Sequence, residues 1–297
     1  MGIILKRHAL LLYTIGFLAM GMIIKTFAYE LFEAPGKSME DTIFANDIVL
    51  VDKLTLKFRP VKLGDILVFR LAKGGFITKR CLGTPGRYIR TIEGEIYLDE
   101  HPVRGAQTVK MKYLIQLSGK RNFHRFTDSA NIRNRVYTDS ANCYTGNLSL
   151  REIQAINSYP YTKKVRKIAN DSYPFVFNKL YPQWTLEDWG PLKVPGKGMV
   201  IVFNKNNYEL YKQLLFDYES IKVQEVGGKY YVGDKEIKSY TIKNDYYFVM
   251  GDNRTTSVDS RYFGFVCGRF ISGKIRAILF SRLDGEFRWD RFFKFTE

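Results

Sequence analysis

The sequence predicts a mainly β protein in which a single N-terminal transmembrane helix precedes an antiparallel β-sheet or barrel with an inserted α+β cap region. Three observations predict this: an apolar run near the N-terminus, short β-rich runs bounded by Gly, Asp and Pro, and the lack of the alternating helices that a parallel sheet needs. The 297 residues are 45% hydrophobic and 15% aromatic, enough to bury a substantial core. The 20 Tyr and 22 Phe favour strands over long helices.

The apolar run spans residues 9–29, with Lys25 as its only charge. A run of 21 residues, at ~1.5 Å rise each, crosses a hydrocarbon core of ~30 Å. Lys6 and Arg7 precede it and acidic residues follow it, so the positive-inside rule predicts that residues 1–8 are cytoplasmic and that the remainder lies outside. A cleaved secretory signal peptide is the alternative, but the run is long for one and ends in a poor cleavage site. A retained anchor is the favoured interpretation.

Short β-rich runs bounded by turn residues fill most of the chain beyond the anchor, and together they predict the β core. Two helical patterns interrupt them, over residues 148–156 and 206–218. The predicted strands are 47–52, 65–69, 75–79, 95–98, 199–203, 229–232, 246–250 and 270–281.

Two segments differ from this core in their polar, basic composition, and we interpret both as insertions. The predicted division is a cytoplasmic tail (1–8), the anchor (9–29), a β core (30–103, 189–203 and 244–283), a first insertion (104–188), a second insertion (204–243) and an aromatic and basic C-terminal tail (284–297). Aromatic and cationic residues alternate in the tail, which predicts either contact with the membrane interface or packing on the core.

The net charge of +16 suits nucleic acid, an anionic membrane surface or anionic substrates. The chain has no glycine-rich phosphate loop, zinc-finger spacing or helix-turn-helix pattern, and its cations are spread along the sequence, so we expect no nucleic-acid partner. Three cysteines without a CxxC pair, and no HExxH motif, predict no metal site and at most one disulfide. No cofactor is predicted.

A candidate nucleophile follows the anchor in the stretch APGKSME, residues 34–40, which contains Ser38. A serine hydroxyl needs a neighbouring base to take its proton. Outside the anchor and its tail, the histidines are His101, in a predicted turn, and His124, in the first insertion. Neither has a motif-like neighbourhood, and both are expected to be solvated surface residues.

Lysine is the other candidate base, provided that burial lowers its pKa from ~10.4 toward neutrality. Lys79 fits this requirement because it follows Phe76, Ile77 and Thr78 in a predicted apolar strand. A third stretch, residues 250–264 (MGDNRTTSVDSRYFG), packs alternating Asp and Arg with a serine behind a hydrophobic strand. Such a loop can form a fixed ion-pair network that orients an amine, although a solvated polar turn has the same composition.

Together these stretches resemble the boxes of the bacterial type I signal peptidases. The order of the boxes and the anchor before the serine also match, and the long segment before the last box resembles versions from the Bacteroidetes. The resemblance covers residues 30–103 and 189–283. The matching stretches are PGKSM (35–39) with GDILVF (64–69), KRCLGTPG (79–86), WGPLKVP (189–195), and GDNR (251–254) through DSRYFG (259–264).

The resemblance implies a role for each residue in these boxes. Ser38 would be the nucleophile, Lys79 the general base, and Ser257 the residue that orients the lysine amine. Asp252 would pair with Arg80, and Asp259 with Arg261, in support of the loop. Residues lining a shallow pocket for small side chains would be Phe32, Ala34, Met39, Phe76, Ile77 and Thr78.

Gly36 departs from the family pattern. Many members have serine or threonine at this position, and its hydroxyl helps to hold the oxyanion. With glycine here, we expect the oxyanion to depend on the Ser38 backbone N–H and on a substitute donor, because one lost donor costs ~3 kcal/mol.

The implied function is that of a membrane-bound serine endopeptidase that removes signal peptides from secreted preproteins with small residues at the cleavage site. Its partners would be preproteins and the lipid bilayer. Its expected location is the bacterial inner membrane, with the N-terminus cytoplasmic and the rest periplasmic or extracytoplasmic. Two alternatives stay open: a specialised maturation protease of the same Ser-Lys class, such as the conjugation-pilus type, and a membrane-tethered binding module with a degenerate site.

Overall fold

A computed structural model describes most of the chain beyond residue 28. The described residues are 13, 15–17, 20–22, 28–72, 74–103, 109–119, 123–130, 132, 136–140, 142–168, 176–177, 180–283 and 285–296. Most of the predicted anchor (9–29) lies outside these residues. Among the helices that the structure does describe, none has both the length and the apolar character needed to cross a bilayer.

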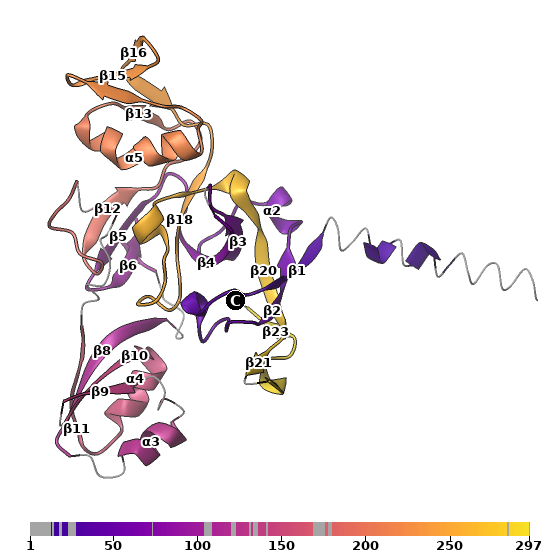
Figure 1. Cartoon of the computed structure of the whole chain (residues 1–297), viewed down its shortest axis with the longest axis vertical. Coiled ribbons are helices and arrows are strands. Elements are labelled where there is room, and N and C mark those ends of the chain that lie inside the picture. Colours follow the sequence, from indigo (N-terminus) through magenta and orange to yellow (C-terminus); the bar gives the residue numbers. More distant parts are fainter. Residues whose placement is uncertain are drawn as a thin grey trace, which may run out of the picture.

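One antiparallel sheet forms the centre of the molecule (Figure 1). Its last long strand lies between two strands from the first quarter of the chain, so distant parts of the sequence meet at its middle. The order is β1 (Tyr29–Glu33), β2 (Ile48–Asp52), β20 (Ile271–Phe280), β3 (Ile66–Arg70), β4 (Phe76–Gly83), β18 (Tyr246–Met250) and β19 (Val266–Cys267), with β23 (Lys294–Phe295) also paired to β20.

The central strands are nearly continuous apolar runs because both of their faces are covered. All five residues of β18 are buried, and so are the first four of β3. Gly273 lets β20 approach β2 closely, since a Cβ atom there would lie 2.6 Å from Val51 Cγ1 and 2.7 Å from the Asp52 carbonyl oxygen. This close contact fixes the strand that joins the two halves of the sheet.

A second sheet and the second predicted insertion share one apolar core with the centre. In α5, Tyr211, Leu214 and Leu215 pack into the cluster that contains Trp189 and Phe248. The elements are β12 (Trp189–Lys193), β5 (Tyr88–Ile92), β6 (Glu95–Leu98) and β7 (His101–Pro102) in the sheet, then β13 (Val200–Val202), α5 (Lys205–Asp217), β14 (Gln224–Val226), β15 (Lys229–Val232), β16 (Lys235–Ile237) and β17 (Ser239–Thr241).

The first predicted insertion contains a separate four-stranded sheet with its own apolar core, built around Ile115, Phe123, Leu148 and Ile156. Helix α4 starts with a capping box, in which Ser149 and Glu152 satisfy each other's backbone N–H groups. The two insertions lie at opposite ends of the longest axis (Figure 1). The elements are β11 (Thr162–Lys167), β8 (Lys110–Leu117), β10 (Cys143–Ser149), β9 (Val136–Ser140), α3 (Phe123–Ser129) and α4 (Leu150–Asn157).

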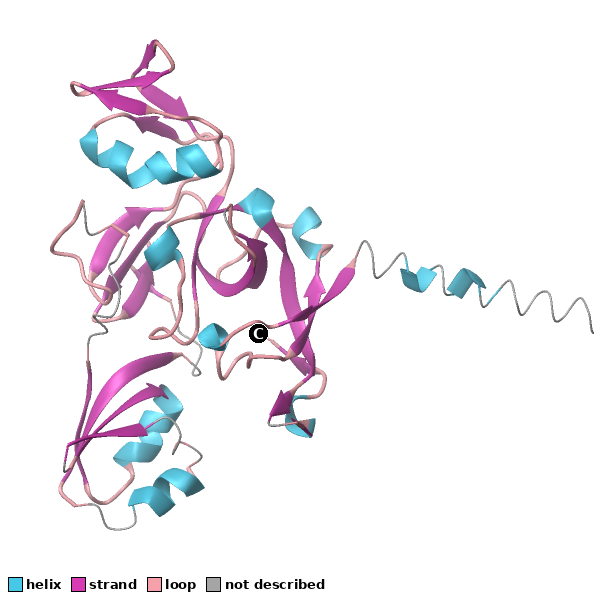
Figure 2. Ribbon diagram, in the orientation of Figure 1, coloured by secondary structure: helices cyan, strands magenta, loops and turns pink. Residues whose placement is uncertain are grey.

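The helices lie at the margins of these sheets, as Figure 2 shows, and most of the backbone is strand or loop. The mainly β prediction is therefore confirmed. All eight predicted strands and both predicted helices are present. An α+β insertion was predicted, but the individual strands of the sheet of residues 110–167 were not. The remaining short elements are η1 (Lys37–Met39), α2 (Thr55–Phe58), α6 (Ser260–Phe263), η3 (Gly268–Phe270), β21 (Arg282–Leu283), β22 (Glu286–Phe287) and η4 (Trp289–Arg291).

The C-terminal tail both packs on the core and exposes aromatic rings. Arg291 is buried, its Nη2 lies 2.6 Å from Asp47 Oδ2, and its guanidinium stacks 4.4 Å from the Phe44 ring centroid. In contrast, Trp289 is 76% exposed and Phe295 is 72% exposed. The tail is thus held in place with its apolar side chains facing outward.

Candidate active site

Ser38 lies in the short 3-10 turn η1, directly after β1 and the Ala34-Pro35-Gly36 turn. Met39 and Ala34 are buried in the apolar cluster beneath this turn, together with Ile43. Ser38 itself is only partly covered. The buried neighbours therefore hold the turn against the sheet while the serine hydroxyl stays accessible.

Lys79 lies on β4, where it is 3% exposed. Its Nζ is 2.6 Å from Ser38 Oγ and donates a 3.0 Å hydrogen bond to the Thr78 carbonyl oxygen. Burial lowers the pKa of Lys79 from its ordinary 10.5 to about 8; the charges of Asp259 and Asp252 oppose this shift. A substantial fraction of this amine is therefore neutral near physiological pH, and it directly contacts a serine hydroxyl.

A loop of residues 251–261 surrounds this pair with two ion pairs. Arg80 is bidentate on Asp252, with Nε–Oδ1 at 2.9 Å and Nη2–Oδ2 at 2.7 Å, and Thr42 Oγ1 donates to Asp252 Oδ2 at 2.6 Å. Bidentate geometry of this kind fixes orientation as well as distance. The arginine next to Lys79 in β4 is thereby attached to the loop.

The second ion pair, between Asp259 and Arg261, is also bidentate, at 2.8 and 2.9 Å. Asp259 accepts a 3.0 Å hydrogen bond from the Gly251 N–H, and Arg261 Nη2 donates to the Arg254 carbonyl oxygen at 2.7 Å. Burial alone raises the pKa of Asp259, but the charge and hydrogen bonds of Arg261 outweigh it and hold this pKa below its usual value. Asp259 therefore stays ionised and closes the loop on itself.

Asn253 connects the loop to the nucleophile turn, a role that sequence reasoning missed. Its backbone N–H donates to the Ser38 carbonyl oxygen at 3.0 Å, and its Nδ2 donates to the Lys37 carbonyl oxygen and to Glu40 Oε2, each at 3.2 Å. The available signal was its position inside the GDNR box. Gly251 permits the same approach, because a Cβ atom there would lie 2.5 Å from the Ser38 carbonyl oxygen.

Ser257 lies beside this junction, with its Oγ only 2.2 Å from where a Cβ atom on Gly251 would stand. The hydroxyl helps to lower the pKa of Asp259, but it makes no well-formed hydrogen bond to any group in the described part of the chain. The structure thus brings Ser257 to the site without the contact to Lys79 that the resemblance implies. Its orienting role stays a prediction.

The predicted substrate-contacting residues lie on β1, on β4 and in the nucleophile turn, which contains Ala34 and Met39. Within the described residues, β1 pairs only with β2, and Phe76–Thr78 of β4 pair only with β3 because β18 joins β4 from Arg80 onward. Phe32 of β1 and Phe76 contact edge to face, with ring centroids 6.0 Å apart. Two strand edges therefore flank the approach to Ser38. Of the predicted pocket residues, Ala34, Met39 and Thr78 are buried, Phe32 and Ile77 are half-buried, and Phe76 is exposed.

Comparison with known proteins identifies the family to which this site belongs. The family model described as signal peptidase, peptidase S26, matches residues 5–179 and 188–280. The chain belongs to this family. Signal peptidase I of Aquifex aeolicus is 26% identical over 262 residues, covering 88% of this chain and 79% of the relative. Signal peptidase I of Buchnera aphidicola (subspecies Baizongia pistaciae) is 25% identical over 269 residues, or 90% and 74%.

Two further matches are more limited, one in the length that it covers and one in structural similarity. A protein of Staphylococcus aureus strain MRSA252 named inactive signal peptidase IA is 29% identical over 105 residues, which are 35% of this chain and 58% of the relative. The solved signal peptidase I of Enterococcus faecalis V583 matches 73% of this chain and 97% of its own at 18% identity, with a TM-score of 0.28. That score is too low to support an argument from shared fold. Membership of the signal peptidase family therefore depends on the sequence match.

The alternative that a histidine acts as the base for Ser38 finds no support in this signal peptidase family member. His101 lies exposed in β7, with its Nδ1 2.8 Å from the Asp99 carbonyl oxygen, and His124 lies in α3 of the first insertion. Neither imidazole hydrogen bonds to Ser38 in the described part of the chain, whereas Lys79 contacts it directly.

Gly36 leaves open space beside the serine of this signal peptidase relative. Its backbone is extended, with φ −166° and ψ 177°, a conformation that any residue adopts. A Cβ atom built on Gly36 meets nothing within 4 Å. The site therefore has room for the side chain that many family members have here.

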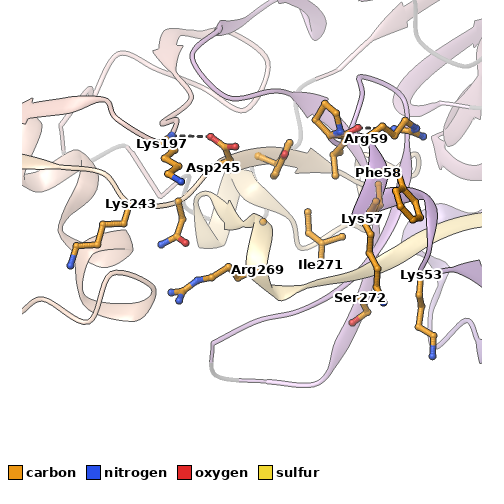
Figure 3. Close-up of a pocket in the computed structure, with 16 residues that line it drawn as sticks. Lys53, Lys57, Phe58, Arg59, Lys197, Lys243, Asp245, Arg269, Ile271 and Ser272 are labelled. Atoms are coloured by element: carbon orange, nitrogen blue, oxygen red, sulfur yellow. Dashed lines mark hydrogen bonds between the residues drawn. The ribbon is translucent and has the colours of Figure 1, made fainter. Parts of the chain in front are cut away.

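A separate basic cavity of about 810 Å³ lies away from Ser38 and Lys79 (Figure 3). Its lining includes one carboxylate, Asp245, which accepts a 2.8 Å hydrogen bond from the Lys197 backbone N–H. Lys53, at one end, donates its backbone N–H to the Ala28 carbonyl oxygen, where the continuously described part of the chain begins. No three His, Cys, Asp or Glu side chains gather to hold a metal ion within the described ranges. The cationic lining residues are Lys53, Lys57, Arg59, Lys197, Lys243 and Arg269.

Proposed function

We propose that this chain is a membrane-bound serine endopeptidase that removes N-terminal signal peptides from secreted preproteins, with Ser38 as nucleophile and Lys79 as general base. The observation that carries the proposal is the 2.6 Å contact between Lys79 Nζ and Ser38 Oγ, made by an amine whose burial lowers its pKa to about 8. A neutral amine in direct contact with a hydroxyl can take its proton.

The reaction then follows in two halves. Neutral Lys79 accepts the Ser38 proton as Oγ attacks the carbonyl carbon at the cleavage site, which gives a tetrahedral oxyanion and an ammonium. The oxyanion collapses to an acyl-enzyme, the C–N bond breaks, and the ammonium returns its proton to the departing amine. Lys79, neutral again, takes a proton from water as its oxygen attacks the ester carbon. When the C–Oγ bond breaks, the Lys79 ammonium returns this proton to Ser38 Oγ, which frees the serine and releases the signal peptide with a new carboxylate end.

The supporting roles follow from the contacts around this pair. The Asp252–Arg80 and Asp259–Arg261 pairs keep the loop rigid, so that Asn253 holds the Ser38 main chain in one position. Ser257 would orient the Lys79 amine after rotation of its buried, unpaired hydroxyl. The Ser38 N–H would hold the oxyanion, helped by a donor that replaces the one missing at Gly36.

The substrate would bind as an extended strand between β1 and β4. Backbone groups along such edges can pair with a third strand, which gives affinity without reading side chains. Specificity would come from shallow pockets bounded by Ala34, Met39 and Thr78, which would admit only Ala-x-Ala-type residues. Phe32 and Phe76 would border the same groove.

The proposed location is the bacterial inner membrane, with residues 9–29 as the single anchor and the N-terminus in the cytoplasm. The exposed Trp289, Phe293 and Phe295 would rest at the outer interface, where aromatic rings are favoured. The basic cavity next to Ala28 would face anionic headgroups. An anchor this close to Ser38 raises the local concentration of preproteins emerging through the same membrane.

The binding-module alternative is the second candidate, because a relative is named inactive. The contact between Ser38 and Lys79 argues against a degenerate site in this chain. The specialised maturation protease shares the same chemistry, so only its substrate range separates it from the main proposal.

The test is cleavage of a purified preprotein in detergent by the full chain and by Ser38→Ala, Lys79→Ala and, as a control, the exposed Lys57→Ala. We expect cleavage at the signal-peptide junction by the wild type and Lys57→Ala, and loss of at least 10³-fold in the other two, since each removes a reacting group. Mass spectrometry of both products locates the cut. Activity surviving Lys79→Ala would reject the dyad, and a wild type inactive on several preproteins would favour the maturation protease or the binding module.

A further inference from the structure

Lys110 is the first residue of β8 and one of the largest fully buried side chains in the described structure, at 1% exposure. Its Nζ lies 3.2 Å from Asp41 Oδ2 and 3.6 Å from Glu40 Oε2. A buried ammonium requires such partners, because an unpaired charge in the interior is strongly unfavourable. A cation from the first insertion thus pairs with the two residues that follow the nucleophile turn.

The Lys110 backbone is attached to the same site. Its N–H donates to the Asp252 carbonyl oxygen at 2.8 Å, and its carbonyl oxygen accepts from the Arg254 N–H at 3.1 Å, forming a parallel bridge opposite Asn253. One residue therefore contacts the loop through its main chain and the nucleophile turn through its side chain.

Residues 40–42, which follow the nucleophile turn, each make a contact with Lys110 or with the loop of residues 251–261. Glu40 accepts from Asn253 Nδ2 at 3.2 Å and faces Lys110, and Thr42 donates to Asp252. Asp41, between them, has φ +75°, a left-handed conformation that is unfavourable for a residue with a side chain. The ion pair to Lys110 is an interaction that can help to offset this unfavourable backbone.

We propose that Lys110 is a positioning residue of the peptidase, through which the sheet of residues 110–167 holds Ser38 at its distance from Lys79. The expected effect of Lys110 on kcat depends on the proposed peptidase function. Its expected effect on the position of the nucleophile turn does not. The first insertion is then a component of the active site rather than an independent appendage.

The test compares the full chain with Lys110→Met, which keeps volume and removes charge, with Asp41→Asn, and with the double variant. Lys112→Met, two residues along the same strand, is the matched control. Asparagine tolerates a left-handed backbone, so Asp41→Asn removes the ion pair from the other side with less risk to folding. We expect kcat to fall 10- to 100-fold in both single variants with KM within twofold, and no further fall in the double variant.

Hydrogen exchange of peptides covering residues 36–43 provides a readout that does not require turnover. We expect exchange there to rise at least tenfold in Lys110→Met and Asp41→Asn. The melting temperature should fall in both because each breaks a buried ion pair, while the sheet of residues 110–167 stays protected and Lys112→Met behaves like the wild type. Unchanged exchange at 36–43 in Asp41→Asn would overturn the proposal. So would equal loss of protection throughout the 110–167 sheet, since it indicates a role in folding alone. A chain that cleaves no preprotein but shows the local change would reject the proposed function and retain this inference.

Discussion

At the scale of single residues, Lys79 has a pKa set by its surroundings rather than by its own chemistry. Burial on β4 disfavours the ammonium, the carboxylates of the neighbouring loop favour it, and the balance puts the pKa at about 8. The same side chain on the surface would be protonated at every physiological pH and useless as a base.

This pKa predicts the pH dependence of the reaction. Only neutral Lys79 accepts the Ser38 proton, and the amine gains its charge as pH falls through about 8, so activity falls on the acidic side. We expect kcat/KM to rise about tenfold between pH 7 and pH 9 and then to level off. The measurement is kcat/KM on one preprotein from pH 6 to pH 10. A maximum of kcat/KM near pH 6 would contradict a lysine base and favour a histidine instead.

Gly36 gives a second prediction at this scale. A serine fits here without strain, since the backbone is extended and the added Cβ meets nothing within 4 Å. Its hydroxyl can add a donor for the oxyanion, so we expect Gly36→Ser to raise kcat by about 10- to 100-fold with little change in KM. Gly36→Ala is the control and is expected to behave as the wild type. No gain from serine would mean that another donor already occupies the position.

The residues that carry the proposed chemistry were predictable because their requirements are local. A serine after a small-residue turn and a lysine inside an apolar strand are both visible in the sequence. Asn253 and Lys110 were not, because their roles depend on backbone groups more than 60 residues away that only the fold brings near. Thr42, a donor to Asp252, was missed for the same reason.

At the scale of elements, the site is a junction between one strand, one turn and one loop. β4 supplies Lys79 and Arg80 on successive positions, so one side chain faces Ser38 while the next pairs with Asp252. Gly251 lets the loop lie directly against η1, because any Cβ there would lie within 2.6 Å of Ser38 or Ser257 atoms.

Gly251→Ala is therefore expected to separate the loop from the nucleophile turn. Backbone atoms have to move to relieve a 2.5 Å contact with the Ser38 carbonyl oxygen, so we expect kcat to fall at least 100-fold and stability to fall by about 1–3 kcal/mol. Preprotein cleavage and thermal melting measure the two effects, with Gly36→Ala as a matched glycine-to-alanine control. Wild-type kcat in Gly251→Ala would show that the loop does not need this close contact.

Elements were predictable where burial leaves a simple pattern. β3 and β18, covered on both faces, are continuous apolar runs, and helix α4 has a complete capping box. The strands of the first insertion were missed because the central strands β8 and β10 alternate buried with half-buried residues and so show no continuous apolar run. Strand β11, with the sequence TKKVRK, buries none of its residues. Strands of this kind become recognisable only when their partners are known.

At the scale of the whole molecule, the net charge of +16, the basic cavity next to Ala28 and the exposed aromatic residues of the tail all favour an anionic membrane surface. The ion pair between Arg291 and Asp47 holds the tail against the core, so the aromatic side chains of the tail point in a fixed direction.

Trp289 makes this surface testable. The chain has three tryptophans, of which Trp189 is buried and Trp289 is 76% exposed. We expect brominated phospholipids to quench the fluorescence of the full chain reconstituted in vesicles, and Trp289→Phe to remove most of that quenching. Equal quenching in both proteins would place the tail away from the bilayer.

The place of β20 in the central sheet has a consequence for biosynthesis. Residues 271–280 separate β2 from β3, and the loop that holds Ser38 comes only shortly before them in the chain. In the proposed topology, a copy still crossing the membrane from its anchor onward would have its serine and lysine outside long before the strand that joins the two halves arrives. Partly exported copies would therefore be inert, and proteolytic activity would appear only after nearly the whole polypeptide has emerged and folded.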